Sequence, residues 1–339
     1  MSIKLSIIVP IYNVERLIER CVRSLMEQTI KEGVEFVFIN DGTPDNSMQI
    51  LNRVISEYPD RKDQIRIFHN HKNLGISETR KRGIAEAQGE YIGWCDSDDW
   101  CELDMFEKLL AGTEDGRYDI VVCNAWLHKK VNGTENITIW EQKKSESPNE
   151  ALMKIWNGSY FPWALWLQIS KKKLIQKASN QIYPVPFAED SFMLMFCFYY
   201  AKSALWLSET LYHYNLFDNG LSLVKQNYQT KENWDAQKKN IDAIVSLLSQ
   251  DSHSEQFQLC MCYIKWHLKE KFKNSFDSIW QYWKTYHECY KYICLYTKTE
   301  PKYKLSVYLT YNFFPFYWLS QKKLHLKKHE ESIGYHSSI

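Results

Sequence analysis

Short apolar runs alternate with segments of helical periodicity over the first hundred residues. The apolar runs predict four strands, which are Leu5–Val9, Glu35–Ile39, Ile65–Phe68 and Tyr91–Trp94. The segments between them predict three helices, the second opening at Thr43-Pro44 and the third running from Ser77 to Gln88. This rhythm is typical of an α/β fold with a parallel, doubly wound sheet, in which ligands bind at the carboxyl ends of the strands.

Polar residues follow three of these strands at that same edge. Tyr12 follows the first strand, Asp41 the second, and Asp96 and Asp98 the fourth. In an extended segment Asp96 and Asp98 point the same way, with Cα atoms roughly 6.5 Å apart. Two convergent carboxylates suit Mg²⁺ or Mn²⁺. The alternative interpretation is a solvated turn that caps the next helix.

The glycine motifs that usually bind phosphates are absent. No Gly-x-Gly-x-x-Gly follows the first strand, and no Gly-x-x-x-x-Gly-Lys-Ser/Thr occurs anywhere. A nucleotide would therefore need the aromatic face of Tyr12 for its base and Asp41 for a base N–H or ribose hydroxyl. A metal at Asp98 would then bind the diphosphate.

Four segments together resemble the family 2 glycosyltransferases. They are SIIVPIYN (6–13), NDGTPD (40–45), NLGISETRKRG (73–83) and GEYIGWCDSDD (89–99). The resemblance is dense over residues 3–110, thinner to about residue 225 and absent beyond it. It implies a GT-A fold and an inverting, nucleotide-sugar-dependent enzyme. The catalytic domain would span residues 1–225, with nucleotide-sugar binding in 1–110, the acceptor side in 111–225 and a helical region in 226–339.

The resemblance also implies a donor site. Its residues would be Pro10, Tyr12, Asp41, Arg80, Asp96 and Ser97. Tyr12 would stack on a uracil-like ring and Arg80 would lie near the diphosphate, although a solvated helix face is the alternative for Arg80. Asp98 would bind the metal, with Asp96 and His213 as further ligands; a packing role is the alternative for His213.

On the acceptor side, inverting chemistry needs a carboxylate that removes the proton of the attacking hydroxyl. Asp190 is assigned as this base, with Glu189 as the alternative or a second acceptor contact. Acidic residues are also favoured in the first turn of any helix. Trp163 and Trp166 would offer aromatic platforms for the sugar rings of the acceptor, and Asp99 a polar contact with it. A core role for at least one of the two tryptophans is equally consistent with the sequence.

The composition indicates a cytoplasmic protein. The chain has 339 residues and 9 cysteines, whose spacing is not that of a zinc site, so they are expected to be reduced thiols. The N-terminus lacks the pattern of a signal peptide, and no apolar stretch is long enough to span a bilayer.

The C-terminal third is basic and aromatic. Residues 261–330 hold 13 lysines, 5 acidic residues and 19 aromatic residues. This composition is typical of helices at a membrane surface, here the inner face of the plasma membrane. Packing against the catalytic domain and a homodimer interface are the competing interpretations. Nucleic acid is disfavoured because the segment contains no arginine.

The sequence thus predicts a metal-dependent, inverting glycosyltransferase. It would move a sugar from a UDP-linked donor to a glycan or lipid-linked acceptor in bacterial surface-polysaccharide synthesis. The alternatives are a nucleotidyltransferase, which also uses paired carboxylates and metal, and a non-catalytic sugar-nucleotide-binding protein.

Overall fold

The computed structural model describes residues 2–131, 133–142, 144–156, 164–185, 189–216 and 230–249, together with residues 262, 265, 266, 269, 275, 276, 278–290, 305 and 308. The chain forms two compact units. The first comprises residues 1–228 and 235–248, and the second comprises residues 229–234 and 249–339.

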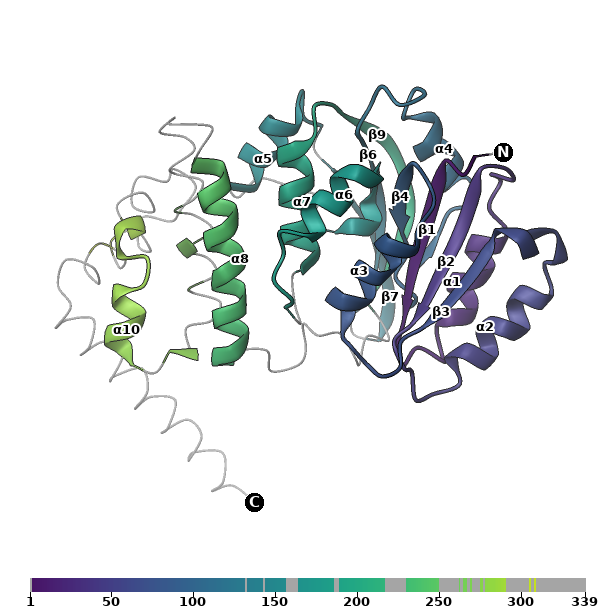
Figure 1. Ribbon diagram of the computed structural model, residues 1–339, viewed down its shortest axis with the longest axis horizontal. Coiled ribbons are helices and arrows are strands. Elements are labelled where there is room, and N and C mark those ends of the chain that lie inside the picture. The colour runs from purple at the N-terminus through teal and green to yellow at the C-terminus, as the bar shows by residue number, and fades with distance from the viewer. Residues whose placement is uncertain are drawn as a thin grey trace, which may run out of the picture. The chain divides into compact units, whose positions relative to one another are not determined.

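The strands of the first unit form one sheet in the order β3-β2-β1-β4-β8-β6-β9-β5, with β7 paired to β6 (Figure 1). Their bounds are β1 Leu5–Ile11, β2 Val34–Asn40, β3 Ile65–His69, β4 Tyr91–Trp94, β5 Trp100–Cys101, β6 Ile120–Val131, β7 Thr134–Trp140, β8 Gln168–Lys171 and β9 Ala204–Asn215. The four strands expected from the sequence are all present, each at or within two residues of the predicted bounds.

Helices cover both faces of this sheet, except α8, which stands apart from it (Figure 1). Their bounds are α1 Ile18–Met26, α2 Ser47–Ser56, α3 Ile76–Glu86, α4 Met105–Ala111, α5 Pro148–Trp156, α6 Lys172–Ser179, α7 Glu189–Tyr200 and α8 Lys231–Ser249. β1, β2, β3 and β4 pair in parallel, and β4 lies on the other side of β1 from β2. A helix that connects two parallel strands of one sheet makes a right-handed crossover. The chain moves in one direction across the sheet from β1 to β3 and in the other from β3 to β4, so α3 lies on the opposite face from α1 and α2 (Figure 1).

Close packing of α3 on the sheet depends on Gly83. A Cβ atom at this position would lie 2.4 Å from a methyl carbon of Ile8 on β1. Any larger residue would force α3 away from the sheet. The carboxyl ends of β1, β2 and β4 and the first turns of α3 therefore lie at one edge, where the sequence predicts the ligand site.

The second half of the sheet is mixed. β8 is antiparallel to both β4 and β6, while β9 runs parallel to β6 and antiparallel to β5. In the β5–β9 pair, Trp100 lies opposite His213 and Cys101 opposite Tyr212. β9 is thereby brought beside the chain that follows Asp98.

Two further helices, α7 and α8, complete the first unit. α7 is buried along most of its length, at Phe192–Phe198. On α8, the Asn240 amide accepts a hydrogen bond from Tyr183 N at 2.8 Å and donates one to Tyr183 O at 3.1 Å. Residues 235–248 of α8 belong to the first unit, and the domain boundary near residue 225 stays a prediction.

In the second unit, the short helix α10 spans Ile279–Lys284. Trp280 stacks on Trp283 at 5.0 Å and is 47% exposed, and the Lys284 ammonium lies 4.7 Å from the Trp280 ring centroid.

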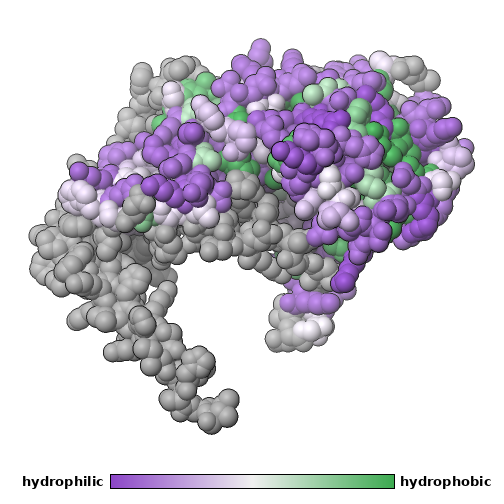
Figure 2. Space-filling view, turned by 60° about the horizontal axis from the view of Figure 1, so that its bottom comes forward, coloured by the Kyte–Doolittle hydropathy of each residue, from purple (hydrophilic) through white to green (hydrophobic). Residues whose placement is uncertain are grey.

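Hydrophilic residues dominate the described surface seen in Figure 2. No helix in the described part of the chain has the length and apolar character that a membrane span requires.

Candidate functional site

The turn after β4 carries the aspartate cluster and is fastened to β9. The backbone N–H of Asp96 donates to the Tyr212 hydroxyl at 3.1 Å, and that hydroxyl donates to Asp99 Oδ2 at 2.8 Å. Asn215 N donates to Asp99 Oδ1 at 2.8 Å. Asp99 is 1% exposed, and burial raises its pKa well above the ordinary value. The Asp99 carboxyl group thus stabilises the turn through these hydrogen bonds. Its predicted contact with the sugar acceptor stays a prediction.

Arg80 joins this turn to α7. It projects from α3, with a side chain that is 6% exposed, and it donates to Asp96 Oδ1 at 2.9 Å and to Glu189 Oε1. The interpretation of Arg80 as a solvated helix residue is therefore wrong. A planar guanidinium suits such a bridge because it presents several donors in a fixed geometry. The Nε atom of Arg80 is buried and has no hydrogen-bond partner in the described structure.

The two carboxylates that open α7 have different surroundings. Glu189 is 4% exposed, and burial raises its pKa to about 7 although Arg80 opposes the shift. Burial also raises the pKa of Asp190, again opposed by Arg80. Among the described residues, the hydrogen bonds to Asp190 come from Ser191, whose backbone N–H donates at 2.7 Å. Among the described residues, Glu189 therefore forms an ion pair with Arg80, whereas Asp190 forms none.

Asp98 is half-buried next to Asp96. Burial and the negative charge of Asp96 raise the Asp98 pKa to about 7, against the opposing effect of Arg80. No side chain in the described part of the chain hydrogen-bonds to the Asp98 carboxylate. A carboxylate that receives no side-chain hydrogen bond from the described residues and has an elevated pKa fits a hard divalent cation.

His213 lies apart from this carboxylate. Side chains alternate along β9, so Tyr212 faces the aspartate turn and His213 faces the other way. The Nε2 atom of His213 is 2.9 Å from Glu102 Oε1, and its Nδ1 atom is 3.0 Å from His128 Nε2. The ring stacks on Trp100 at 4.8 Å, and burial lowers its pKa. The predicted cluster of Asp96, Asp98 and His213 is not assembled: no group of three His, Cys, Asp or Glu side chains in the described structure is placed to hold a metal ion.

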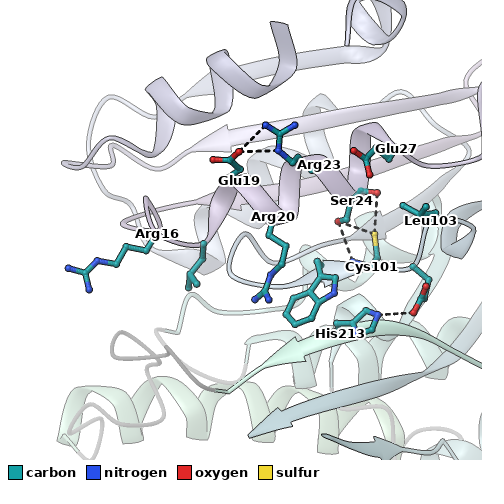
Figure 3. Close-up of a pocket in the computed structure, with 12 residues that line it drawn as sticks. Arg16, Glu19, Arg20, Arg23, Ser24, Glu27, Cys101, Leu103 and His213 are labelled. Carbon is teal, nitrogen blue, oxygen red and sulfur yellow. Dashed lines mark hydrogen bonds and ion pairs between the residues drawn. The ribbon is translucent and has the colours of Figure 1, made fainter. Parts of the chain in front are cut away.

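His213 instead lines a pocket of about 840 Å³ on the α1 side of the sheet (Figure 3). Arg20 extends toward it from α1, with its guanidinium carbon 3.3 Å from the Trp100 ring centroid. Arg23 is held by Glu19 at 2.9 Å. The Trp100 ring thus contacts the Arg20 guanidinium and stacks on His213, and this stack explains the packing of His213.

The predicted base pocket lies at the ends of β1 and β2. Tyr12 is 44% exposed, so its ring is available for stacking, while Pro10 is buried within β1 and Ser97 is 6% exposed. Asp41 is 4% exposed and accepts hydrogen bonds from Asn70 Nδ2 at 2.7 Å and from the backbone N–H groups of residues 74 and 75 at 2.8 and 2.9 Å. Asp41 thus fixes the loop that leads into α3 and Arg80. Its nucleotide contact stays a prediction.

The loops after β1 and β2 are tied together by side chains. Asn13 N donates to Thr43 Oγ1 at 2.8 Å, and Glu15 N donates to Asp45 Oδ2 at 2.9 Å. Asn13 has a φ of 55°, a left-handed conformation that asparagine tolerates better than most residues. The prediction that α2 opens at Thr43 is wrong: α2 begins at Ser47, because the Thr43 and Asp45 side chains bind the neighbouring loop instead.

On the acceptor side, Trp166 packs in the interior. It is 5% exposed, stacks on Tyr212 at 4.3 Å with an interplanar angle of 10°, and meets Trp140 edge-on at 5.7 Å. This confirms the interpretation that one of the two tryptophans packs in the core. Trp163 lies outside the described residues. The sequence did not point to Tyr212 and Asn215, whose only signal is that they lie on the strand β9.

Known proteins are similar to this chain in sequence and in fold. The chain is 34% identical over 226 residues to the uncharacterized glycosyltransferase EpsJ of Bacillus subtilis, an alignment that covers 64% of this chain and 62% of that protein. The chain thus spans less than two thirds of that relative. The crystal structure of S. aureus TarS 1-349 in complex with UDP-GlcNAc has a TM-score of 0.62 at 19% identity, covering 86% of this chain and 81% of that one.

A second solved structure is similar over nearly the whole chain. The mannosyltransferase PcManGT from Pyrobaculum calidifontis, in complex with GDP-Man and Mn²⁺, has a TM-score of 0.52 at 14% identity and covers 99% of this chain and 88% of that one. These likenesses confirm the expected GT-A fold. The family model described as "Glycosyl transferase family 2" matches residues 6–196, more than half of the sequence. The chain therefore belongs to glycosyl transferase family 2.

Proposed function

We propose that this protein transfers a sugar, with inversion at the anomeric carbon, from a nucleotide-diphosphate donor to a hydroxyl of a glycan or lipid-linked acceptor. One observation carries the proposal: the guanidinium of Arg80 hydrogen-bonds both to Asp96, the carboxylate expected on the donor side, and to Glu189, the carboxylate expected on the acceptor side. Donor and acceptor groups that are far apart in the sequence therefore share one site.

Asp190 is the general base in this proposal. Glu189 is paired with Arg80, so its charge is already compensated, whereas Asp190 is free of an ion pair among the described residues. Burial raises the Asp190 pKa, which makes it a stronger proton acceptor than an ordinary carboxylate. Removing the acceptor proton as the oxygen attacks strengthens the nucleophile on the face opposite the leaving diphosphate. Glu189 would then position α7.

Asp98 would hold a Mn²⁺ or Mg²⁺ ion, with Asp96 close by. The elevated pKa of Asp98 and its lack of a side-chain donor support this assignment. Magnesium and manganese commonly take one or two carboxylates, and substrate phosphates supply other ligands. A bound cation would offset the charge that develops on the leaving diphosphate. His213 has no part in this proposal.

The proposed donor is a UDP-sugar. The similar TarS structure carries UDP-GlcNAc, whereas the similar mannosyltransferase carries GDP-Man. The half-exposed ring of Tyr12 offers a stacking face for the base, and Asp41 retains lone pairs for a base N–H. A role in bacterial surface polysaccharide is supported by a further relative, the minor teichoic acid biosynthesis protein GgaB of Bacillus subtilis, which is 30% identical over 135 residues.

The proposed location is the cytoplasm, with peripheral contact at the inner face of the plasma membrane. The basic, aromatic composition of residues 261–330 supports this contact, as do the exposed Trp280 and its neighbouring Lys284. A homodimer through the same region is the competing outcome.

A thermal-shift screen of UDP-, GDP- and other nucleotide sugars, with and without Mn²⁺, tests the donor. A ligand that binds the native state raises its stability by RT ln(1 + [L]/Kd). We expect UDP-sugars to raise the unfolding temperature more in Mn²⁺ than in EDTA. Hydrolysis of the bound donor without acceptor would then exclude a purely binding protein, and release of pyrophosphate from a nucleoside triphosphate would favour a nucleotidyltransferase instead.

A further inference from the structure

The hydroxyl of Tyr212 links the aspartate turn to β9. Tyr212 is fully buried, and its hydroxyl accepts from Asp96 N at 3.1 Å while it donates to Asp99 Oδ2 at 2.8 Å. The ring is held by the stack on Trp166 at 4.3 Å. One hydroxyl therefore satisfies a backbone donor and a carboxyl oxygen of the same turn, and its own position is set by packing.

Asn215 makes the complementary contacts three residues further along β9. Its backbone N–H donates to Asp99 Oδ1 at 2.8 Å, and its side-chain amide donates to Asp98 O at 3.2 Å. Asn215 is fully buried. β9 thus holds the turn at Asp96, Asp98 and Asp99 through residues that are themselves fully buried.

We propose that Tyr212 is a positioning residue for donor binding, whose hydroxyl fixes the backbone at Asp96 so that the Asp96 and Asp98 carboxylates are aimed at the donor diphosphate and its cation. This inference rests on the proposed function. Without the hydroxyl, the part-buried Asp96 N–H and the buried Asp99 Oδ2 both lose a partner, and an unsatisfied buried group costs more than the bond itself contributes. The turn would relax to recover hydrogen bonds, and a binding group that is loosely held loses much of its effect.

Tyr91 provides a matched control at the other end of β4 from the Asp96 turn. It opens β4, whereas the Asp96 turn follows the end of β4. Tyr91 is 2% exposed, and its hydroxyl donates to Tyr118 O at 2.7 Å. Tyr91→Phe and Tyr212→Phe therefore each remove one buried phenolic hydroxyl and keep the ring, but only Tyr212→Phe loosens the turn.

The experiment is a titration of UDP into the full chain by calorimetry, in Mn²⁺ and in EDTA, with the unfolding temperature recorded for each variant. We expect Tyr212→Phe to bind UDP in Mn²⁺ at least about tenfold more weakly than the wild type, the equivalent of losing roughly one buried hydrogen bond. Tyr91→Phe should bind like the wild type, although both variants lose thermal stability. In EDTA the three proteins should differ much less.

Asn215→Ala supplies a second variant, since it removes the amide contact with Asp98 O and leaves the Tyr212 hydroxyl in place; it should weaken UDP binding in Mn²⁺ in the same direction. Equal affinity of Tyr212→Phe and Tyr91→Phe in Mn²⁺ would overturn this inference alone. A wild-type protein that binds no UDP under any condition would overturn the proposed donor, and this inference with it.

Discussion

Arg80 and Glu189 are 109 positions apart in the sequence, yet their side chains form a buried ion pair. The same guanidinium also binds Asp96 at 2.9 Å. The Arg80 guanidinium thus holds the end of β4 and the first turn of α7 together, and within the described part of the chain the adjacent Asp190 forms no ion pair.

Removal of Arg80 should destabilise the protein strongly. Arg80→Met leaves two carboxylates at a buried position without their cation, and breaking a buried pair in this way costs about 3–5 kcal/mol. We expect urea unfolding to show a loss of this order. Arg53→Met is the control, because Arg53 forms ion pairs with Glu19 and Glu57 while 52% exposed, where such pairs contribute little. Similar losses for the two variants would contradict the importance of the buried bridge.

Asp190→Asn should abolish transfer and spare donor binding. A general base acts on the acceptor proton in the transition state, so we expect kcat to fall about 10²-fold or more with little change in UDP affinity. Glu189→Gln is the matched variant, one residue away. If Glu189→Gln is inactive and Asp190→Asn is active, the two roles are reversed. A loss of UDP affinity in Asp190→Asn would indicate a distorted pocket instead.

Asp98→Asn should weaken nucleotide binding only in the presence of metal. The amide keeps the shape of the side chain but removes the charge that a divalent cation requires. We expect weaker UDP binding in Mn²⁺ and unchanged binding in EDTA, measured by calorimetry. Equal affinity of wild type and Asp98→Asn in Mn²⁺ would exclude Asp98 as a metal ligand. His213→Gln should show no selective effect of Mn²⁺, because His213 bonds to Glu102 and His128.

The protonation of Glu189 should make stability depend on pH. Its pKa is raised by burial from an ordinary value of 4.5 to about 7. Between these two values the native protein binds more protons than the unfolded chain, so the free energy of unfolding should fall as pH rises from about 4.5 to about 7. The slope contributed by one such group reaches about 1.4 kcal/mol per pH unit.

This pH dependence is measured by urea unfolding at several pH values in EDTA. Glu189→Gln cannot titrate, so its slope should be shallower than that of the wild type; part of the slope should persist, because the Asp98 pKa is also raised to about 7. An identical pH dependence for both proteins would show that Glu189 remains ionised in the native state.

The second unit should bind anionic membranes in part through Trp280. Lysines near a bilayer contribute an electrostatic attraction that salt screens, whereas a buried tryptophan contributes an apolar part that salt does not remove. We expect Trp280→Ser to weaken binding of the full chain to anionic liposomes even at high salt. Ile139→Ser, which replaces a 54% exposed residue on β7, is the control. If the wild-type protein does not bind anionic liposomes at low salt, the result would favour a role for this region in packing against the catalytic domain or in a dimer.

Much of the first 100 residues could be predicted from the sequence alone. The strands β1 to β4 follow from local apolar runs, and α3 from local periodicity, because each element is specified by residues that are neighbours in the chain. The parallel order of these strands then places Tyr12, Asp41 and Asp96 at one edge. This part of the site needed no knowledge of distant contacts.

The tertiary structure decided what each of these residues touches. The Tyr212 hydroxyl reaches Asp99 across 113 positions and Asp96 across 116, and Arg80 meets Glu189 across 109. No local pattern encodes such contacts, because they depend on the pairing of β5 with β9 and on the docking of α7. The same pairing of β5 with β9 determined the direction of the His213 side chain. Because side chains alternate along β9, His213 points toward Trp100 and its neighbour Tyr212 points toward the aspartates. The sequence thus determined which chemical groups gather at the edge of the sheet. The long-range packing determined which of them remain available to a ligand, because a buried carboxylate or imidazole that already forms hydrogen bonds within the protein cannot also bind a ligand through the same atoms.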